Sequence, residues 1–227
     1  MAKSESPSIF SPSVIVLSTG IAASLFLGAR VVSKLRRIPQ AIQIPPQYLH
    51  KKTLFGKVTS VGDGDNFRFY HTPGGFLTGW GWLRATPPIN KRGYGKETLS
   101  VRLCGVDAPE RAHWGNPAQP FSEEALIWLR SYLMGRRVRI KPLSIDQYQR
   151  VVAKCWVLRY TGWKDVSAEM IKNGIGVVYE GKTSAEFDGQ EERYKRLEAM
   201  AKKRRRGLWG VNGALQTPGE YKKVHKQ

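Results

Sequence analysis

Residues 54–70 read LFGKVTSVGDGDNFRFY, and this stretch predicts two strands that bend around a tight Gly-Asp-Gly turn. Beyond the turn, Phe67 and Phe69 share one face of the second strand. Arg68 and Tyr70 share the opposite face, so the sheet is expected to bury one side. The stretch therefore predicts the first hairpin of a β-rich domain.

Further elements are predicted on both sides of a long central segment. Strands are expected in three apolar stretches, at residues 100–106, 136–142 and 151–160. Helices are expected between Ser122 as cap and Gly135 as terminator, at residues 166–172, and at residues 191–206. Together they indicate an α+β, mainly β fold, a five-stranded barrel of the oligonucleotide-binding type with about three helices. Such a barrel suits a nucleic acid ligand but does not by itself imply catalysis.

Residues 14–32 read VIVLSTGIAASLFLGARVV and contain one charge, Arg30. As a helix they would reach about 28 Å, close to the hydrocarbon thickness of a bilayer. Lys34, Arg36 and Arg37 form a basic flank behind them. The segment predicts an uncleaved N-terminal transmembrane helix. A cleaved signal peptide is the alternative, although the run ends without a clear cleavage site.

The predicted organisation follows from these elements and from the composition of the segments between them. The parts are a tail at 1–13, a membrane anchor at 14–32, a proline-containing tether at 33–53, a barrel domain at 54–210 with an insertion at 70–99, and a basic tail at 211–227.

The charge balance points to a polyanionic partner. The chain has 37 Lys and Arg against 18 Asp and Glu, a formal net charge of +19. Such a surface attracts nucleic acid phosphates, and anionic membrane lipids are the alternative. Two cysteines do not make a disulfide framework, and Cys104 and Cys155 both lie in strand-like apolar runs, which indicates core thiols. The four histidines lack ligand spacing, which argues against zinc.

Acids and arginines recur in a pattern that suits phosphodiester hydrolysis. Asp65 and Asp107 would hold a hard cation such as Ca²⁺ or Mg²⁺, because carboxylate oxygens are the ligands these ions prefer. Arg102 lies in an apolar strand and must reach a carboxylate, a phosphate or solvent. Arg102 and Arg150 together could grip one diester through their planar forks, with structural ion pairs as the alternative.

Glu110 lies three residues after Asp107, just past a proline, on a turn that could aim its carboxylate at the metal. Its expected role is to position or deprotonate the attacking water. The alternatives are a contact with the ligands around the metal, or a structural pair with Arg111 or Arg136. An Asp-Gly-Asp by itself is most often a plain turn, so its partnership with Asp107 carries the interpretation.

Three motifs, GDGDNF at 62–67, VRLCGVDAPE at 101–110 and DQYQR at 146–150, resemble in this order the staphylococcal nuclease (thermonuclease) family. The resemblance covers about residues 54–209. The apolar anchor, the tether and the insertion further resemble the membrane-anchored mitochondrial branch of that family found in fungi.

The resemblance implies a calcium-dependent endonuclease in the mitochondrion, held by a single membrane span. It further implies that the Ala108 carbonyl and water complete the shell of Ca²⁺, and that Asp63 supports the loop. Tyr148 matches a family position that contacts substrate phosphate, and Tyr179 is expected near the pocket. As bare residues, both tyrosines would more often serve packing.

The chain departs from the family pattern at three places. Gln149 replaces the usual glycine, Ala108 replaces a threonine, and the insertion has no counterpart in the compact bacterial enzymes. The insertion could cover the cleft, dock a partner, stack bases, or contact a membrane through Phe76, Trp80 and Trp82.

The leading hypothesis is a membrane-tethered, calcium-dependent endonuclease that hydrolyses DNA or RNA with little sequence specificity, since the visible groups address the backbone. The first alternative is a barrel that binds nucleic acid without cutting it. The second is a membrane-anchored interaction protein that works through its insertion. The preferred nucleic acid and any protein partner stay open.

Overall fold

The computed structural model describes residues 12–90, 93–112, 116–180, 186–210 and 216–224. The chain divides into two compact units, Met1–Arg37 and Ile38–Gln227. The first unit contains one helix, α1 (Pro12–Lys34). A search of the described residues finds no helix with the length and apolar character that a bilayer crossing requires. The transmembrane anchor predicted at residues 14–32 is therefore not confirmed.

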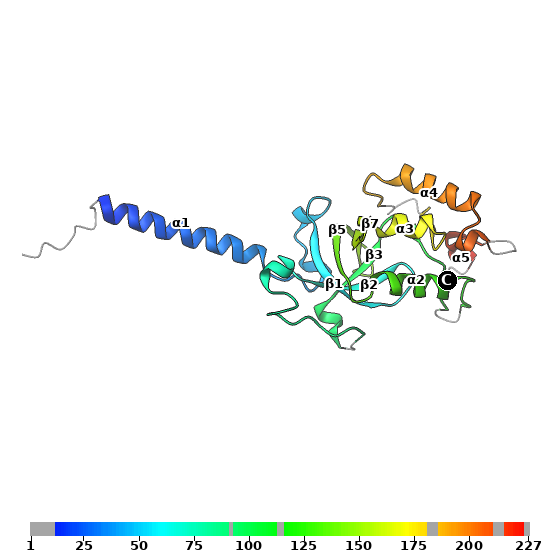
Figure 1. Cartoon of the computed structure of the whole chain (residues 1–227), viewed down its shortest axis with the longest axis horizontal. Helices are drawn as coiled ribbons and strands as arrows, with labels where there is room; N and C mark the ends of the chain where they lie inside the picture. Colours follow the sequence, from blue (N-terminus) through cyan, green and yellow to red (C-terminus); the bar gives the residue numbers. More distant parts are fainter. Residues whose placement is uncertain (1–11, 91–92, 113–115, 181–185, 211–215, 225–227) are drawn as a thin grey trace, which may run out of the picture. The chain divides into compact units, whose positions relative to one another are not determined.

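Five strands of the second unit close into a barrel, as predicted (Figure 1). Their order is β3-β2-β1-β5-β6, and a parallel pairing of β6 with β3 closes the ring. The strands are β1 (Leu54–Val61), β2 (Asn66–His71), β3 (Leu99–Leu103), β5 (Arg137–Ile145) and β6 (Val151–Arg159). β7 (Gly162–Asp165) extends the sheet beyond β6, and the short strands β4 (Val106–Asp107) and β8 (Val177–Val178) pair outside it.

The first hairpin forms where the alternating pattern predicts it. β1 and β2 run antiparallel, and Phe67 and Phe69 are buried while Arg68 is exposed. Tyr70 differs from its predicted place on the polar face. Its side chain is buried against Trp80 of the insertion, with the ring centroids 5.8 Å apart. The inserted segment thus covers Tyr70, at the end of the β2 face that the two-residue period predicts to be exposed.

The three predicted helices are present, and a fourth, at the C-terminal end of this unit, was not predicted. They are α2 (Ser122–Leu133), α3 (Val166–Lys172), α4 (Glu191–Lys203) and α5 (Pro218–Val224). We expected Ser122 to cap α2, but Ser122 is the first residue of the helix. Phe121 occupies the cap position in a left-handed conformation, with φ 72°, and no side chain caps the helix. The predicted stop at Gly135 is confirmed, since this glycine adopts φ +71°.

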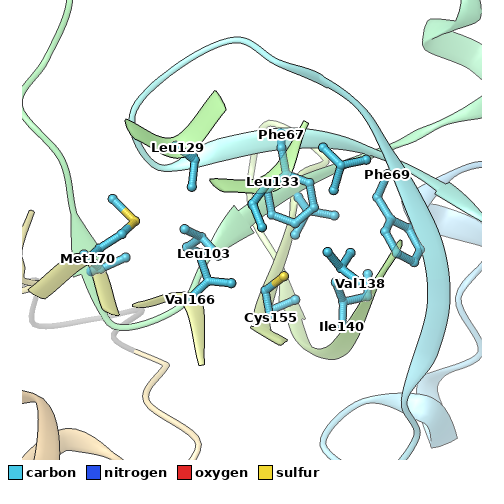
Figure 2. Packing of buried hydrophobic residues seen from close by; sticks show 14 of the residues in the cluster. Phe67, Phe69, Leu103, Leu129, Leu133, Val138, Ile140, Cys155, Val166 and Met170 are labelled. Atoms are coloured by element: carbon cyan, nitrogen blue, oxygen red, sulfur yellow. The ribbon is translucent and has the colours of Figure 1, made fainter. Parts of the chain in front are cut away.

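The barrel interior holds the main hydrophobic core (Figure 2). Phe67 and Leu103 from the strands meet Leu129 and Leu133 from α2, and all four side chains are fully buried. Cys155 lies among them, which confirms its role as a core thiol. α2 therefore packs its apolar face against the core of the barrel.

The boundaries of the domain are wider than predicted. Ile38, Ala41 and Ile44 are buried members of the core, so residues 38–53 belong to the domain and not to a tether. The short 3₁₀ helices η1 (Ala41–Gln43) and η2 (Pro46–Tyr48) lie in this segment. The prolines of the segment suggested an extended spacer, but Ile38 and Ile44 pack into the core, while Ile42 is exposed.

The described part of the predicted basic tail, residues 216–224, also belongs to the folded unit. Tyr221 of α5 is buried, and its hydroxyl donates a hydrogen bond to the Pro117 carbonyl. The side-chain amide of Gln119 donates to the Gln216 carbonyl at 3.2 Å. α5 therefore lies beside the segment that precedes α2 (Figure 1).

The insertion between β2 and β3 includes two further 3₁₀ helices, η3 (Gly75–Thr78) and η4 (Tyr94–Glu97). Trp80 is buried there, with the Arg84 guanidinium 4.2 Å from its ring centroid. Phe76 and Trp82 are 59% and 63% exposed. Of the three aromatic residues suggested for a membrane contact, only Phe76 and Trp82 are therefore accessible.

Candidate active site

One residue of the β1–β2 turn and two strand residues form the centre of the candidate site. Asp65 immediately precedes β2, and the pairing of Asn66 with Arg102 brings β2 beside β3 at this level. Arg102 contacts Asp65 Oδ2 through Nε at 3.3 Å and Asp107 Oδ1 through Nη2 at 3.2 Å. The guanidinium in the apolar strand thus bridges two carboxylates. The sequence left its partner open, and the structure supplies the carboxylates.

Burial makes the charges of this group interdependent. Asp107 is 3% exposed, and its burial, together with the nearby charge of Asp65, raises the pKa of its carboxyl group. Lys222 and Arg102 oppose that shift. Burial lowers the pKa of Arg102, but Asp65 and then Asp107 more than offset it, so that this pKa is raised. The site therefore stabilises positive charge next to its two carboxylates.

The Gly-Asp-Gly turn packs tightly against the second acidic motif. A Cβ atom at Gly64 would lie 2.6 Å from the Cβ of Ala108, so only glycine fits there. Asp63 Oδ1 accepts a hydrogen bond from the Gly64 amide at 2.8 Å. Burial, followed by the charge of Asp65, raises the pKa of Asp63. These contacts agree with the supporting role that the family resemblance implies for Asp63.

Glu110 lies at the edge of the same group. Gln119 holds its backbone through two hydrogen bonds of 2.8 Å. The side-chain oxygen of Gln119 accepts from the backbone amide of Glu110, and the backbone amide of Gln119 donates to the Glu110 carbonyl. Arg111, one of its suggested structural partners, contacts Glu123 at 3.3 Å instead. The Glu110 side chain contacts Lys222 Nζ through Oε1 at 2.8 Å.

Lys222 is a site residue that sequence reasoning missed. It lies on α5, and its Nζ is 2.7 and 2.8 Å from the two carboxylate oxygens of Asp107. It is separated from Asp107 by 115 positions, and one lysine in a basic segment gives no signal of such a contact. Burial lowers the pKa of Lys222, but Asp107 and Glu110 more than offset this and raise it.

Arg150 and Tyr148 lie on the turn between β5 and β6. Arg150 Nε contacts Asp146 Oδ2 at 2.7 Å, and the Arg150 guanidinium lies 5.2 Å from the Tyr148 ring centroid. In the described part of the chain, Arg150 is not in contact with the Asp65, Arg102 and Asp107 group. The parallel register pairs Arg102 with Val152, and Arg150 lies on the turn two residues before Val152, just outside β6.

The turn itself explains one departure from the family pattern. Gln149 has φ +58°, a left-handed conformation that favours glycine. The Asp146 carboxylate stabilises the turn by accepting hydrogen bonds from the amides of Tyr148 at 2.9 Å and Arg150 at 2.8 Å. A glutamine is tolerated there because these bonds hold the backbone.

The two tyrosines expected at the site lie in different places. Tyr179 follows β8, and the centroid of its ring is 5.2 Å from Arg102 Cζ, so it belongs to the central group. Its amide donates to the Gly105 carbonyl at 3.2 Å. Tyr148 is 69% exposed and contacts Arg150. It therefore accompanies the second arginine and not the first.

The donors at the centre fit a hard cation. Asp65 and Asp107 supply carboxylate oxygens, and a positively charged group already lies against Asp107 and Glu110. Among the described residues, no three His, Cys, Asp or Glu side chains are grouped as a complete metal site. An ion held here would need backbone oxygen and water as further ligands, as Ca²⁺ and Mg²⁺ both accept.

A closed barrel that carries an arginine between two carboxylates, with a further acid beside them, has the groups of a small phosphodiesterase. Residues 100–211 match the family model described as staphylococcal nuclease homologue. The chain belongs to the staphylococcal nuclease family, and it is a nuclease with a nucleic acid as its substrate.

Curated relatives from yeasts extend the match to nearly the whole chain. A protein of Debaryomyces hansenii named "Probable endonuclease LCL3" is 56% identical over 223 residues, covering 97% of this chain and 94% of the relative. A protein of the same name from Komagataella phaffii is 53% identical and covers 96% of both chains. A third, from Meyerozyma guilliermondii, is 55% identical and covers 97% of both.

Proposed function

We propose that this nuclease is a calcium-dependent endonuclease that hydrolyses phosphodiester bonds of DNA or RNA with little sequence specificity. The observation that carries the proposal is the bridge that Arg102 forms between Asp65 and Asp107, with Glu110 at the edge of the same group. The groups present address phosphates and not base edges, so sequence preference is expected to be weak.

The residues have distinct proposed roles. Asp65, Asp107 and the Ala108 carbonyl would hold Ca²⁺, which when bound would polarise the phosphate and favour ionisation of water. Glu110 orients the attacking water or accepts its proton. Arg102 and Arg150 bind the non-bridging oxygens of the diester and stabilise the charge that develops during hydrolysis. Tyr179 would contact this diester beside Arg102, and Tyr148 would contact it beside Arg150.

Circular substrates test the activity directly. The full chain should convert circular single-stranded DNA, relaxed circular duplex DNA and circular RNA to fragments in Ca²⁺, and a chelator should stop the reaction. Only cutting within the strand opens a circle, so this result separates endonuclease from exonuclease action. Asp107→Asn should lose cleavage. Cleavage that persists in the chelator would contradict the calcium dependence.

We also propose a mitochondrial location, which rests on the family resemblance alone. Attachment to a membrane through residues 14–32 stays a prediction from the sequence, since no described helix is long and apolar enough to span a bilayer. Fractionation of cells with a tagged chain tests both. Recovery with mitochondria, in the pellet after alkaline carbonate extraction, would support them, and recovery outside mitochondria would refute the location.

A further inference from the structure

Lys222 occupies a position that the proposed chemistry does not use. Its ammonium nitrogen contacts both oxygens of Asp107 and one oxygen of Glu110, at 2.7, 2.8 and 2.8 Å. Charge-assisted hydrogen bonds of this length are among the stronger contacts in proteins. Lys222 thus acts as the counter-ion of Glu110 and as a second counter-ion, beside Arg102, of Asp107.

These contacts occupy the atoms that a metal ion would need. Both Asp107 oxygens bind Lys222, and Oδ1 is shared with Arg102. Ca²⁺ binds carboxylate oxygens at about 2.3–2.6 Å, closer than the ammonium nitrogen lies. An ion at that distance from Asp107 would repel the ammonium and compete for the same lone pairs. Asp107 therefore cannot serve Ca²⁺ and Lys222 in the present geometry together.

α5 can move without opening the barrel. The barrel closes through β3 and β6, and α5 supplies none of its strands. A cavity of about 200 Å³ lies beside the site, and Asp107, Tyr179, Lys222 and Lys223 are among the residues that line it. Only seven residues form α5, and Tyr221 is its buried anchor, so a small segment carries the competing charge.

We propose that Lys222 is an internal competitor for the cation site, and that α5 is a cap which withdraws when a divalent cation binds Asp107. This inference rests on the metal site of the proposed function. Capping and metal binding exclude each other. The apparent association constant for the metal is therefore the intrinsic constant multiplied by the fraction of molecules in which the cap is open. At low calcium the cap keeps the acids paired and the nuclease inactive.

Calcium binding to the full chain, measured by calorimetry without substrate, tests the competition. Lys222→Met should bind Ca²⁺ about tenfold more tightly, the gain expected if the cap is closed in about nine-tenths of the molecules. Lys223→Met is the matched control, since it removes the next positive charge from an exposed side chain on the same helix. Lys223→Met should bind as the unmodified chain does, and Asp107→Asn should lose binding.

Hydrogen exchange of the unmodified chain tests the movement itself. The Tyr221 amide donates to the Thr217 carbonyl at 2.9 Å, so its exchange reports on α5. Adding Ca²⁺ should speed the exchange of this amide while the strand amides stay protected. In Lys222→Met the amide should exchange faster from the start and respond less to Ca²⁺.

The outcomes separate the two proposals. If the unmodified chain binds Ca²⁺ through Asp107 but Lys222→Met binds no more tightly, or if Ca²⁺ slows exchange in α5, the cap is refuted and the metal site stands. If neither the unmodified chain nor Lys222→Met binds Ca²⁺, the metal site fails and the cap fails with it. The cap is supported if Lys222→Met binds Ca²⁺ more tightly while Lys223→Met does not, and if Ca²⁺ speeds amide hydrogen exchange in α5 of the unmodified chain.

Discussion

Arg102 Nη2 lies 3.2 Å from Asp107 Oδ1, across the turn that joins β3 to β4. The Arg102 side chain is 19% exposed and the Asp107 side chain is 4% exposed, so the contact pairs two charges that are largely buried. Losing one partner of such a pair leaves a buried charge without compensation. The pair therefore has to be tested with substitutions that keep charge or shape.

Arg102→Lys should lower the cleavage rate by about 10³ or more, since a single ammonium cannot replace the planar fork that binds a phosphate and two acids. Initial rates on single-stranded DNA in Ca²⁺ measure the loss. Circular dichroism of the variant should match that of the unmodified chain. A rate within threefold of normal would remove Arg102 from the catalytic group.

Glu110→Gln should reduce the rate constant for cleavage by about 10²–10⁴, the contribution typical of a group that positions or deprotonates water. The substitution keeps the shape of the side chain, and substrate binding should change little. Glu123→Gln is the matched control, because Glu123 pairs with Arg111 on an exposed surface. Single-turnover rates of both variants separate the roles, and equal losses would contradict the role of Glu110.

Arg150→Lys should slow cleavage by about 10³ as well, although Arg150 contacts Asp146 and not the central acids. The result depends on Arg150 turning from Asp146 to the substrate, and Arg150 lies two residues before Val152, the partner of Arg102 in the sheet. Arg159→Lys, at the other end of β6, should cut normally. An active Arg150→Lys would show that the pair with Asp146 is purely structural.

Tyr194→Phe should lower the free energy of unfolding by about 1–3 kcal/mol, because it leaves a buried carboxylate short of one donor. The fully buried Tyr194 hydroxyl donates to Asp165 Oδ2 at 2.9 Å and thereby joins α4 to the cap of α3. Tyr160→Phe is the control, since Tyr160 is fully exposed. Urea denaturation measures both, and equal midpoints would refute the expectation.

Asp165 should also make stability depend on pH. Burial raises its pKa above the ordinary value of 3.8. At pH between the ordinary pKa and the raised pKa, the folded chain binds more protons than the unfolded chain. The free energy of unfolding therefore falls as the pH rises through that window. Asp165→Asn should flatten this fall. Urea midpoints measured from pH 3.5 upward check it, and an unchanged slope would contradict the shift.

Local sequence was sufficient for the barrel and for most of the acidic site. The hairpin at residues 54–70 has a two-residue period around a glycine turn, and such patterns depend on neighbours in the chain. Asp65, Arg102 and Asp107 were predicted to converge, and they do, because β2 pairs with β3 next to Asp65 and a short turn after β3 brings Asp107 back to Arg102. Glycine stops and apolar spacing likewise located α2 and α3, and they located α4 except for its end, which is Lys203 and not the predicted residue 206.

Only the tertiary structure showed that Ile38 belongs to the core, that Arg150 is paired with Asp146, and that Lys222 lies on Asp107. Each depends on contacts between residues brought together by packing or on the choice among nearby charges. A lysine in a basic segment has many carboxylates within its potential reach. Which of them it binds is decided by the place where α5 packs, and no local pattern records that place.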